Sequence, residues 1–278
     1  MKRLDDRTAV VTGAASGIGR AVAVRLASKG CDLALADIDG EALDETIRRV
    51  EAKGRRASRH VVDVSQLSQM ERFAADVERE HGGAQVLVNN AGVAVGKTFE
   101  EHTLDDFEWL LGINLWGVIY GCRLFLPMLE RADEGHIVNI SSIFGVVGMP
   151  MNSSYCASKF AVRGLSESLR VELESKNVGV TSVHPGGVAT NVVARGRFSE
   201  TLEGRKAQAQ SIEMFKRFMP PEQAAVPIVR AIERNEPRVL ITREARVLDG
   251  LARLSPRALH RILLRRWRRY LETGEVAI

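Results

Sequence analysis

The sequence predicts an α/β protein built on a doubly wound, seven-stranded parallel sheet with helices on both faces. Two observations lead to this fold class. Short apolar and β-branched runs alternate along the chain with longer segments of helical period. Most of the short runs read as continuous hydrophobic stretches, as expected of strands buried on both faces, and parallel neighbours need the crossover connections that the intervening helices provide.

Seven strands and the helices between them follow in order from this pattern. The strands are expected at residues 8–12, 32–36, 59–62, 85–88, 136–140, 178–183 and 238–242. The helices are expected at residues 18–29, 41–53 and 67–80, in a segment ending near 130, and at 155–175. No interior stretch has the composition of a linker, so residues 1–242 are expected to form one domain. Residues 190–220 begin just after a strand, where such sheets bind ligands, and we interpret them as a substrate lid.

Composition argues against several classes of protein. A hydrophobic content of 45% is ordinary for a globular core, and no uninterrupted apolar run approaches the roughly 18 residues of a membrane span. The basic residues 1–3 lead into Asp5 and not into an apolar segment, which argues against a secretory signal. Three cysteines without Cys-x-x-Cys spacing indicate neither a disulfide framework nor a zinc site. A cytoplasmic location is therefore expected, and no metal site.

Positive charge is concentrated in a C-terminal extension, residues 243–278. The net charge of the chain is +4, yet residues 243–270 hold nine arginines against only Glu244 and Asp249. Ser255 followed by Pro256 is typical of a helix start, and apolar residues recur after it at helical spacing. A basic amphipathic helix fits three partners: its own domain or a sister subunit, an anionic membrane surface contacted peripherally, or nucleic acid. The first is favoured and nucleic acid is the weakest, because no recognition motif accompanies the arginines.

The turn after the first strand has the composition of a dinucleotide-binding loop. Residues 12–19 read Thr-Gly-Ala-Ala-Ser-Gly-Ile-Gly and open the first helix. Glycines let the backbone turn tightly and approach a pyrophosphate, which the helix N-terminus attracts. Three glycines alone are a weak indication, but Asp37 lies 18 residues after Gly19, at a strand end where an acid binds the ribose 2′-hydroxyl. A carboxylate there repels a 2′-phosphate, so NAD is favoured over NADP, while Asp39 is interpreted as a helix cap.

Several separated motifs resemble those of the classical short-chain dehydrogenase/reductases. The glycine spacing of residues 12–19 is similar to Thr-Gly-x-x-x-Gly-x-Gly in that family, and Lys159 follows Tyr155 by four positions. The other matches are Asp63-Val64, Asn89-Asn90-Ala91-Gly92, Asn114, Ser142 at 13 residues before Tyr155, and Pro185-Gly186-Gly187-Val188-Ala189-Thr190. They occur in order over residues 8–190, and the strand pattern extends the resemblance to residue 242. The resemblance implies a Rossmann-type NAD(P)-dependent oxidoreductase that acts on a secondary alcohol or ketone and forms a homodimer or homotetramer.

The resemblance assigns four residues to catalysis and a larger set to the cofactor. Tyr155 is the implied acid/base, and Ser142 is the residue implied to bind the substrate oxygen. Lys159 is implied to lower the pKa of Tyr155 and to bind the nicotinamide ribose, and Asn114 to complete a proton path through a water. The implied cofactor contacts are Gly13, Ser16, Gly17, Ile18, Gly19, Asp37, Asp63, Val64, Asn90, Ala91, Gly92, Tyr155, Lys159, Pro185, Gly186, Val188 and Thr190. Positions four apart on a helix share a face, and a phenol of pKa about 10 becomes a useful base only beside positive charge.

Other residues in the same segments are weighed against ordinary structural roles. Ser141 competes with Ser142, which the 13-residue offset favours. Cys156 lacks a histidine in a motif suited to nucleophilic catalysis, and His184 is interpreted as a hydrogen-bonded structural residue. Apolar residues near the site suggest either a lipophilic substrate or simple packing; they are Ile143, Phe144, Val146, Val147, Met149, Val192 and Val193. The alternatives to an NAD-preferring dehydrogenase are an NADP-dependent carbonyl reductase and a non-catalytic dinucleotide-sensing protein on the same fold.

Overall fold

Seven parallel strands form the central sheet, as the sequence predicts. The computed structural model describes residue 1 and residues 3–274; residue 2 and residues 275–278, the end of the predicted extension, lie outside the described residues. The strands of the sheet are β1 (Thr8–Thr12), β2 (Asp32–Asp37), β3 (Ala57–Val61), β4 (Val86–Asn89), β6 (Gly135–Ile140), β7 (Val178–Pro185) and β9 (Arg238–Ile241). Their order is β3-β2-β1-β4-β6-β7-β9, and neighbouring strands are parallel. The order reverses between β1 and β4, and ligands bind at such reversals beyond the carboxyl ends of the strands.

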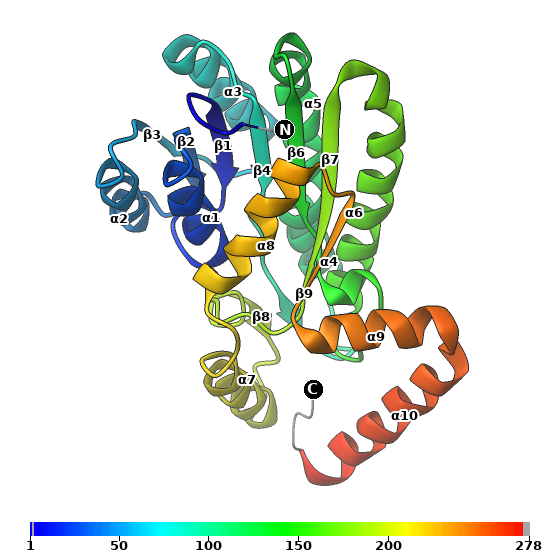
Figure 1. Cartoon of the computed structure of the whole chain (residues 1–278). Coiled ribbons are helices and arrows are strands. Elements are labelled where there is room, and N and C mark those ends of the chain that lie inside the picture. Colours follow the sequence, from blue (N-terminus) through cyan, green and yellow to red (C-terminus); the bar gives the residue numbers. More distant parts are fainter. Residues whose placement is uncertain (2, 275–278) are drawn as a thin grey trace.

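Helices cover both faces of this sheet (Figure 1). One face carries α1 (Gly17–Ala27), α2 (Gly40–Glu51) and α8 (Pro221–Arg234), and the other carries α3 (Leu67–His81), α5 (Gly117–Arg131) and α6 (Ser153–Glu172). Alternate strand residues enter the two cores: Val11 and Val88 pack with the first set of helices, and Val10 and Leu87 with the second. This two-sided burial explains why the strands read as continuous apolar runs.

The segment predicted to be a lid, residues 190–220, contains regular structure that the sequence analysis does not specify. β8 (Arg197–Phe198) pairs in parallel with β5 (Val95–Gly96), and α7 (Leu202–Phe215) follows. The guanidinium of Arg197 binds carboxylate oxygens of Asp105 and Asp106, in α4 (Leu104–Leu111), at 2.6 and 3.3 Å. The same group lies 4.2 Å from the centre of the Trp109 ring. The first part of the segment is therefore anchored to the loop after β4 and to α4.

The C-terminal extension forms two helices, α9 (Arg243–Leu254) and α10 (Pro256–Thr273). The break falls at Ser255, which occupies the N-cap position of α10 although its side chain makes no capping hydrogen bond. Figure 1 shows the pair at the lower end of the molecule, where β9 finishes, with α10 folded back beneath α9. α9 therefore starts at the same edge of the sheet as the predicted cofactor site.

One helix has the length and hydropathy of a membrane span, contrary to the expectation drawn from uninterrupted apolar runs. Residues Leu104–Arg131 form a continuous 28-residue helix with an 18-residue window of mean hydropathy 1.4, of which 39% is buried. The helix consists of α4, a π-helical turn at Gly112–Trp116, and α5. Its inner face contributes Val118, Phe125 and Leu129 to the second core. This face of the helix thus serves the core of the doubly wound domain, and interruptions at Asn114 and Arg123 keep each apolar run short.

Candidate active site

The turn between β1 and α1 has the backbone geometry of an anion-binding loop. Gly13 and Gly17 have φ of +64° and +55°, in the left-handed region that favours glycine. A Cβ on Gly19 would lie 2.1 Å from the Gly13 carbonyl oxygen, so α1 can begin against the loop only with glycine at this position. Ser16 is the N-cap of α1 and its side chain makes no capping bond, while Ile18 is buried in the first core. The first N–H groups of α1 therefore form a cradle that fits a pyrophosphate.

Asn90 holds this loop from the β4 side. Its Nδ2 donates to the carbonyl oxygens of Thr12 and Gly13, both at 3.0 Å. The N–H groups of Asn90 and Ala91 donate to Thr12 Oγ1 at 3.0 and 3.2 Å. A Cβ on Gly92 would lie 3.6 Å from Lys159 Nζ, so this motif connects the loop to the predicted catalytic residues. The amide of Asn90, predicted to contact the cofactor, supports the loop itself.

Asp37 ends β2 beside the glycine loop. Its buried carboxylate accepts hydrogen bonds from the N–H groups of Ala15 at 2.8 Å and Asp39 at 3.0 Å. These bonds fix a carboxylate at the strand end where an acid binds the ribose 2′-hydroxyl in dinucleotide sites. Asp39 accepts from the N–H of Ala42 at 3.0 Å and caps α2, which confirms the cap interpretation. The second oxygen of Asp39 accepts from the guanidinium of Arg195 at 2.8 Å. This bond joins α2 to the predicted lid, and no motif indicates it.

Asp63 and Val64 lie in the turn after β3, at the same edge of the sheet. Asp63 Oδ1 accepts from the N–H and the hydroxyl of Ser65 at 2.9 and 2.7 Å. Val64 packs on the helix that carries Asn114, because a Cβ on Gly117 would lie 2.8 Å from Val64 Cγ2. The predicted adenine contacts are therefore held in place by partners on both sides.

The segment after β7 lies against the glycine loop. It contains the predicted contacts Pro185, Gly186, Val188 and Thr190. A Cβ on Gly17 would lie 3.1 Å from Thr190 Cγ2, so the two segments touch. The N–H of Gly187 donates to Glu244 Oε1, in the first turn of α9, at 3.2 Å. Glu244 thus supports the cofactor segment from the extension; it was missed because it lies outside every recognised motif.

Tyr155 and Lys159 lie one turn apart on α6, above the end of β6. Lys159 is buried, its Nζ donates to the carbonyl oxygen of Ile140 at 2.9 Å, and it lies 5.6 Å from the centre of the Tyr155 ring. Burial lowers the pKa of the Lys159 ammonium to about 8. Burial also raises the pKa of the Tyr155 phenol to about 12, against a smaller lowering by its hydrogen bond with Ser142.

The Lys159 ammonium and an oxidised nicotinamide, both positive, are expected to lower the pKa of Tyr155 together. Among the groups of the chain itself, desolvation of the phenol is the larger effect. The ammonium is directed at the carbonyl of Ile140 and not at the phenol oxygen. A further positive charge close to Tyr155 is therefore needed before the phenolate is favoured near neutral pH.

Ser142 and Ser141, the two candidates for the substrate-binding serine, face different partners. The hydroxyl of Ser141 donates to the carbonyl oxygen of Lys159 at 2.8 Å and is buried. Ser142 is the N-cap of a 3₁₀ turn at Ile143–Gly145, where its Oγ accepts from the Phe144 N–H at 3.1 Å. The Ser142 hydroxyl has no backbone acceptor in the described structure. Its hydrogen-bond partner is the Tyr155 phenol, whose pKa it lowers. Ser141 therefore supports the backbone of α6, and Ser142 lies beside the phenol.

Asn114 lies in the π-helical turn and its amide is fully used by the protein. Oδ1 accepts from the Val93 N–H at 2.8 Å, and Nδ2 donates to the Val93 carbonyl at 2.9 Å and to Ser158 Oγ at 3.3 Å. π-Helical turns are frequent at functional sites. Gly92 separates Asn114 from Lys159, since its Cβ would approach Asn114 Oδ1 at 3.2 Å and Lys159 Nζ at 3.6 Å. Asn114 thus fixes the backbone beside the lysine.

His184 is fully buried at the end of β7 and is bonded on both sides of its ring. Nδ1 lies 3.1 Å from the Ser142 carbonyl oxygen, and Nε2 lies 3.0 Å from Ser182 Oγ. A carbonyl only accepts hydrogen bonds, so Nδ1 carries the proton and Nε2 accepts from Ser182. Burial lowers the pKa of His184 to about 4, which keeps the ring neutral. This geometry confirms the hydrogen-bonded structural interpretation and ties the histidine to Ser142.

Cys156 and part of the apolar set are packing residues. Cys156 is buried, its sulfur accepts from the Met149 N–H at 3.3 Å, and burial raises the pKa of its thiol, which disfavours a nucleophile. Ile143, Val147 and Val193 are buried. The half-buried members are Phe144, Val146, Met149 and Val192. The Phe144 ring lies 6.1 Å from the Tyr155 ring in an edge-to-face arrangement, so it is the apolar side chain best placed to meet a substrate.

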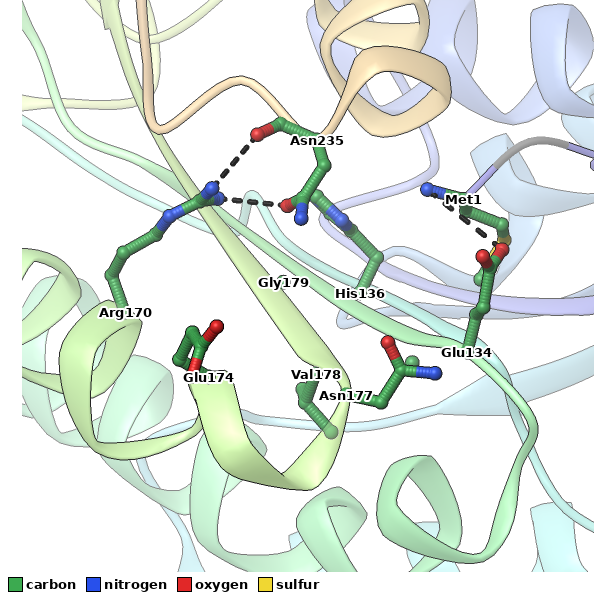
Figure 2. Close-up of a pocket in the computed structure, with 10 residues that line it drawn as sticks. Met1, Glu134, His136, Arg170, Glu174, Asn177, Val178, Gly179 and Asn235 are labelled. Carbon is green, nitrogen blue, oxygen red and sulfur yellow. Dashed lines mark hydrogen bonds and ion pairs between the residues drawn. The ribbon is translucent and has the colours of Figure 1, made fainter.

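A polar hollow lies at the opposite, amino-terminal end of the sheet (Figure 2). It measures about 150 Å³ and is lined by Met1, Glu134, Gly135, His136, Arg170, Glu174, Asn177, Val178, Gly179 and Asn235. Arg170 donates to the Asn235 side chain and carbonyl oxygen, both at 2.8 Å. None of the predicted site residues lines this hollow. Across residue 1 and residues 3–274, no group of three His, Cys, Asp or Glu side chains is arranged to hold a metal ion.

Comparison with known proteins is consistent with this geometry. Residues 7–200 match the short chain dehydrogenase family. The chain is 37% identical over 265 residues to "Putative oxidoreductase SadH" of Mycobacterium tuberculosis, covering 95% of this chain and 96% of that protein. A short chain dehydrogenase/reductase from Burkholderia phymatum in complex with NAD superposes with TM-score 0.82 at 28% identity, covering 100% and 99% of the two chains. A metagenomic short-chain oxidoreductase in complex with NADP gives TM-score 0.71 at 31% identity, covering 86% and 97%.

The fold and the cofactor loop define a nicotinamide-dependent oxidoreductase of the Rossmann type. Within that class the chain belongs to the short chain dehydrogenase family, which confirms the resemblance read from the motifs. The glycine loop and the N-terminus of α1 fit the pyrophosphate of a nicotinamide dinucleotide, and solved relatives hold either NAD or NADP.

Proposed function

We propose that the protein interconverts a secondary alcohol and a ketone, with NAD preferred and Tyr155 as the acid/base. The observation that carries the proposal is the grouping of Ser142, Tyr155 and Lys159, a phenol beside a hydroxyl and close to a buried ammonium. A phenol in that position can exchange one proton with a substrate oxygen. The nicotinamide, when bound, supplies the hydride acceptor or donor for this reaction.

Each residue of the group has its own task in the proposed reaction. Tyr155 takes the hydroxyl proton when an alcohol is oxidised and gives a proton when a ketone is reduced. Ser142 donates to the same substrate oxygen and orients it toward the phenol. Lys159 keeps positive charge near the phenolate and binds the nicotinamide ribose. Asn114 fixes the backbone beside Lys159, and we assign it to the path by which the proton reaches solvent.

The preference for NAD rests on Asp37. Its carboxylate is fixed by two backbone N–H groups, and residues 38–40 contain no lysine or arginine that would attract a 2′-phosphate. Arg195 is the feature that favours the alternative, an NADP-dependent carbonyl reductase, because it reaches Asp39 from the proposed lid. The Arg195–Asp39 ion pair is exposed and therefore weak. We expect the carboxylate of Asp37, at the ribose position, to have the larger effect on cofactor choice.

Replacing Asp37 with alanine tests this preference directly. We expect the Kd of NAD to rise about tenfold more than that of NADP, because the ribose loses an acceptor while the phosphate loses a repelling charge. Arg195→Gln is the matched control. It should leave the Kd of NAD unchanged and can raise only the Kd of NADP. The measurement is nucleotide binding by fluorescence titration, and equal losses for the two nucleotides after Asp37→Ala would contradict the ribose contact.

The proposed substrate is lipophilic. Phe144 faces Tyr155, and Val146, Met149 and Val192 are only half-buried, so a substrate bound against Ser142 meets apolar side chains. Residues 190–220, anchored through Arg197, are the proposed lid over this substrate. These apolar side chains suit an alcohol or ketone with hydrocarbon substituents.

A cofactor and substrate screen tests the proposed reaction. The purified chain is assayed with NAD and NADP against lipophilic secondary alcohols, and with the reduced cofactors against the matching ketones, at the nicotinamide absorbance. Turnover should fall by about 10²–10⁴-fold in Tyr155→Phe while NADH binding stays measurable. Residual turnover close to the unmodified level would remove Tyr155 as the acid/base. Nucleotide binding without turnover of any pair would favour the dinucleotide-sensing alternative.

We also propose that the protein is a cytoplasmic homodimer or homotetramer assembled through the long helices that carry Asn114 and Tyr155. Apolar side chains are exposed on these helices, namely Trp116 at 50%, Phe160 at 42% and Val171 at 77%. Such a surface favours association with a copy of the same helices. Analytical ultracentrifugation of the intact chain, with Phe160→Asp and Val171→Asp as disrupting variants, tests this assembly.

A further inference from the structure

The end of the molecule formed by α9 and α10 differs in charge from the rest of the chain. The two helices contain nine arginines against Glu244, Asp249 and Glu272, whereas the whole chain has a net charge of only +4. The remainder of the chain is therefore slightly negative. Asp249 is already paired with Arg238 and Arg253, so the extension presents an uncompensated positive charge.

One stripe of α10 combines arginine and leucine, and every member of it is exposed. Arg257, Arg261, Leu264, Arg268 and Leu271 follow at intervals of four, three, four and three, which places them on one face of the helix. Leu264 is 40% exposed and Leu271 is 65% exposed. A soluble helix that only carried charge for solubility would not place leucines between the arginines of its outer face.

α9 repeats this pattern on a smaller scale. Arg243, Val247 and Leu254 lie four and seven residues apart and are exposed, with Val247 at 61% and Leu254 at 88%. The inner side of α10 is used differently, because Leu259 is buried and Leu263 and Trp267 are half-buried where α10 packs against α9. The exposed aliphatic residues are thus surplus to the packing of the two helices on each other.

The two helices are attached to the carboxyl-terminal edge of the sheet, where the candidate active site lies. Glu244, in the first turn of α9, binds the Gly187 N–H, and α9 also packs against the 3₁₀ turn that follows Ser142. Figure 1 shows α7, α9 and α10 together at this end of the molecule. α7 begins with Leu202, which is 70% exposed.

We propose that the α9–α10 pair docks on an anionic lipid surface and turns the opening of the candidate active site toward it. The arginines would bind the phosphates of the lipid headgroups. The exposed leucines between them would insert at the boundary between the headgroups and the acyl chains. This docking does not depend on the proposed reaction.

Other partners fit the same helices less well. A nucleic acid offers phosphate to the arginines but no environment for Leu254, Leu264 and Leu271. A second copy of the chain would need an acidic surface, yet many surface carboxylates are already paired within the domain. These include Glu45 with Arg48 and Arg49, Glu78 with Arg131, Asp105 and Asp106 with Arg197, and Glu130 with Lys176. A lipid surface supplies both charge and apolar depth.

Co-sedimentation of the intact chain with large unilamellar vesicles tests the docking. Binding should be strong to vesicles of phosphatidylcholine and phosphatidylglycerol, weak to phosphatidylcholine alone, and reduced by high salt, which screens the headgroup charge. The triple variant Arg257→Gln, Arg261→Gln, Arg268→Gln should lower the affinity for anionic vesicles by at least about tenfold. The matched control is Arg48→Gln, Arg72→Gln, Arg79→Gln, which removes equal charge from exposed positions on α2 and α3 and should bind normally.

Two further variants separate the sources of binding. Arg257→Lys, Arg261→Lys, Arg268→Lys keeps the charge and should keep the affinity. Leu264→Ser, Leu271→Ser should weaken binding severalfold at high salt, where the apolar contribution remains. All substituted positions are exposed, so thermal unfolding and NADH binding should be unchanged in every variant.

Four outcomes would overturn the proposal. The first is equal binding to neutral and anionic vesicles, and the second is equal loss in the matched control. The third is capture by duplex DNA that competes with vesicles and is insensitive to the leucine variant. The fourth is a loss of self-association in the triple variant without any vesicle binding. Failure of the docking would leave Tyr155-dependent turnover intact, whereas failure of the reaction would leave vesicle binding intact, so the two proposals are tested separately.

Discussion

The two ends of the central sheet contain similar residues arranged for different purposes. The carboxyl end has a buried lysine (Lys159), a tightly packed glycine (Gly19) and a buried histidine (His184). At the amino end a half-buried arginine, a tightly packed glycine and a buried histidine line the polar hollow of Figure 2. The types of residue therefore do not distinguish a reactive site from a structural one.

The difference lies in how the polar atoms are used. Arg170 donates to the carbonyl oxygens of Val180 and Asn235 and to the Asn235 side chain, so its guanidinium is committed to neighbouring backbone. Lys159 donates to Ile140, one carbonyl for an ammonium that has three donors, and Tyr155 has a hydroxyl neighbour but no backbone acceptor. Spare hydrogen-bonding capacity beside an anion-binding loop is the feature on which we base the proposal that the carboxyl end is the reactive one.

The largest expected effect separates Lys159 from Arg170. Lys159→Met should lower turnover by about 10²–10³-fold, because it removes the charge beside the phenol and a cofactor contact. Arg170→Met should leave turnover unchanged and lower the free energy of unfolding by about 1–3 kcal/mol, since it leaves backbone acceptors unpaired. Steady-state kinetics and urea unfolding measure the two effects.

Lys159→Arg is the informative control for this pair. The guanidinium keeps the charge but is planar and larger, and the nearby Gly92 backbone leaves it little room, so turnover should stay low. Full turnover in Lys159→Arg would mean that charge alone is required. A loss of turnover in Arg170→Met at unchanged stability would remove the contrast between the two ends.

Sequence patterns predicted the sheet well because they depend on burial and local spacing. All seven strands of the central sheet and the helices α1, α2, α3 and α6 were predicted, since the inner strands are buried on both faces and short hydrophobic runs alternate with segments of helical period. The motifs also placed Asn114, Ser142, Tyr155 and Lys159 at one strand edge. The strand order itself was not predicted, because order is a property of contacts far apart in the sequence.

The parts that sequence analysis missed depend on such distant contacts. Glu244 supports Gly187 across 57 residues, and Arg195 binds Asp39 across 156 residues. Neither residue belongs to a motif, because a single side chain bonded to backbone leaves no pattern in its neighbours. The support that the Asn90 side chain gives to Thr12 and Gly13 was also not predicted, because its motif indicates a cofactor loop but not which atoms hold that loop.

A second, smaller effect separates Gly19 from Gly179. Gly19→Ala would place a Cβ 2.1 Å from the Gly13 carbonyl oxygen, so the loop must shift and the Kd of NADH should rise by at least about tenfold. Gly179→Ala would place a Cβ 2.3 Å from Asn235 Oδ1 at the other end of the sheet. We expect Gly179→Ala to lose about 1–3 kcal/mol of stability with normal NADH binding. Weakened NADH binding in both variants would show that the two ends are coupled.

The smallest effect separates the buried histidines His184 and His136. Both should give the free energy of unfolding a similar pH dependence, but only His184 should affect turnover. Burial lowers the pKa of His184 to about 4 and of His136 to about 3, from an ordinary value of 6.5. The unfolded chain binds these protons first, so the stability that the neutral histidines contribute is complete above pH 6.5. It is lost as the pH falls from 6.5 toward 4 for His184 and toward 3 for His136. Between pH 7 and pH 5 the loss should be about 2 kcal/mol for each histidine. Urea unfolding of His136→Gln and His184→Gln at these two pH values should show a shallower acid dependence than the unmodified chain.

Turnover distinguishes the two histidines because only His184 reaches the reactive group. Its Nδ1–H donates to the Ser142 carbonyl, whereas His136 Nε2 meets Thr181 at the far end of the sheet. In His184→Asn the amide nitrogen can replace Nδ1 and keep the bond to Ser142; in His184→Gln the longer side chain carries its amide toward Ser182 instead. His184→Gln should therefore lower kcat roughly fivefold with little change in the Kd of NADH, while His184→Asn and His136→Gln stay near the unmodified rate. Equal rates in His184→Asn and His184→Gln would mean that the histidine only fills space, and Ser142 would then owe its position to the 3₁₀ turn alone.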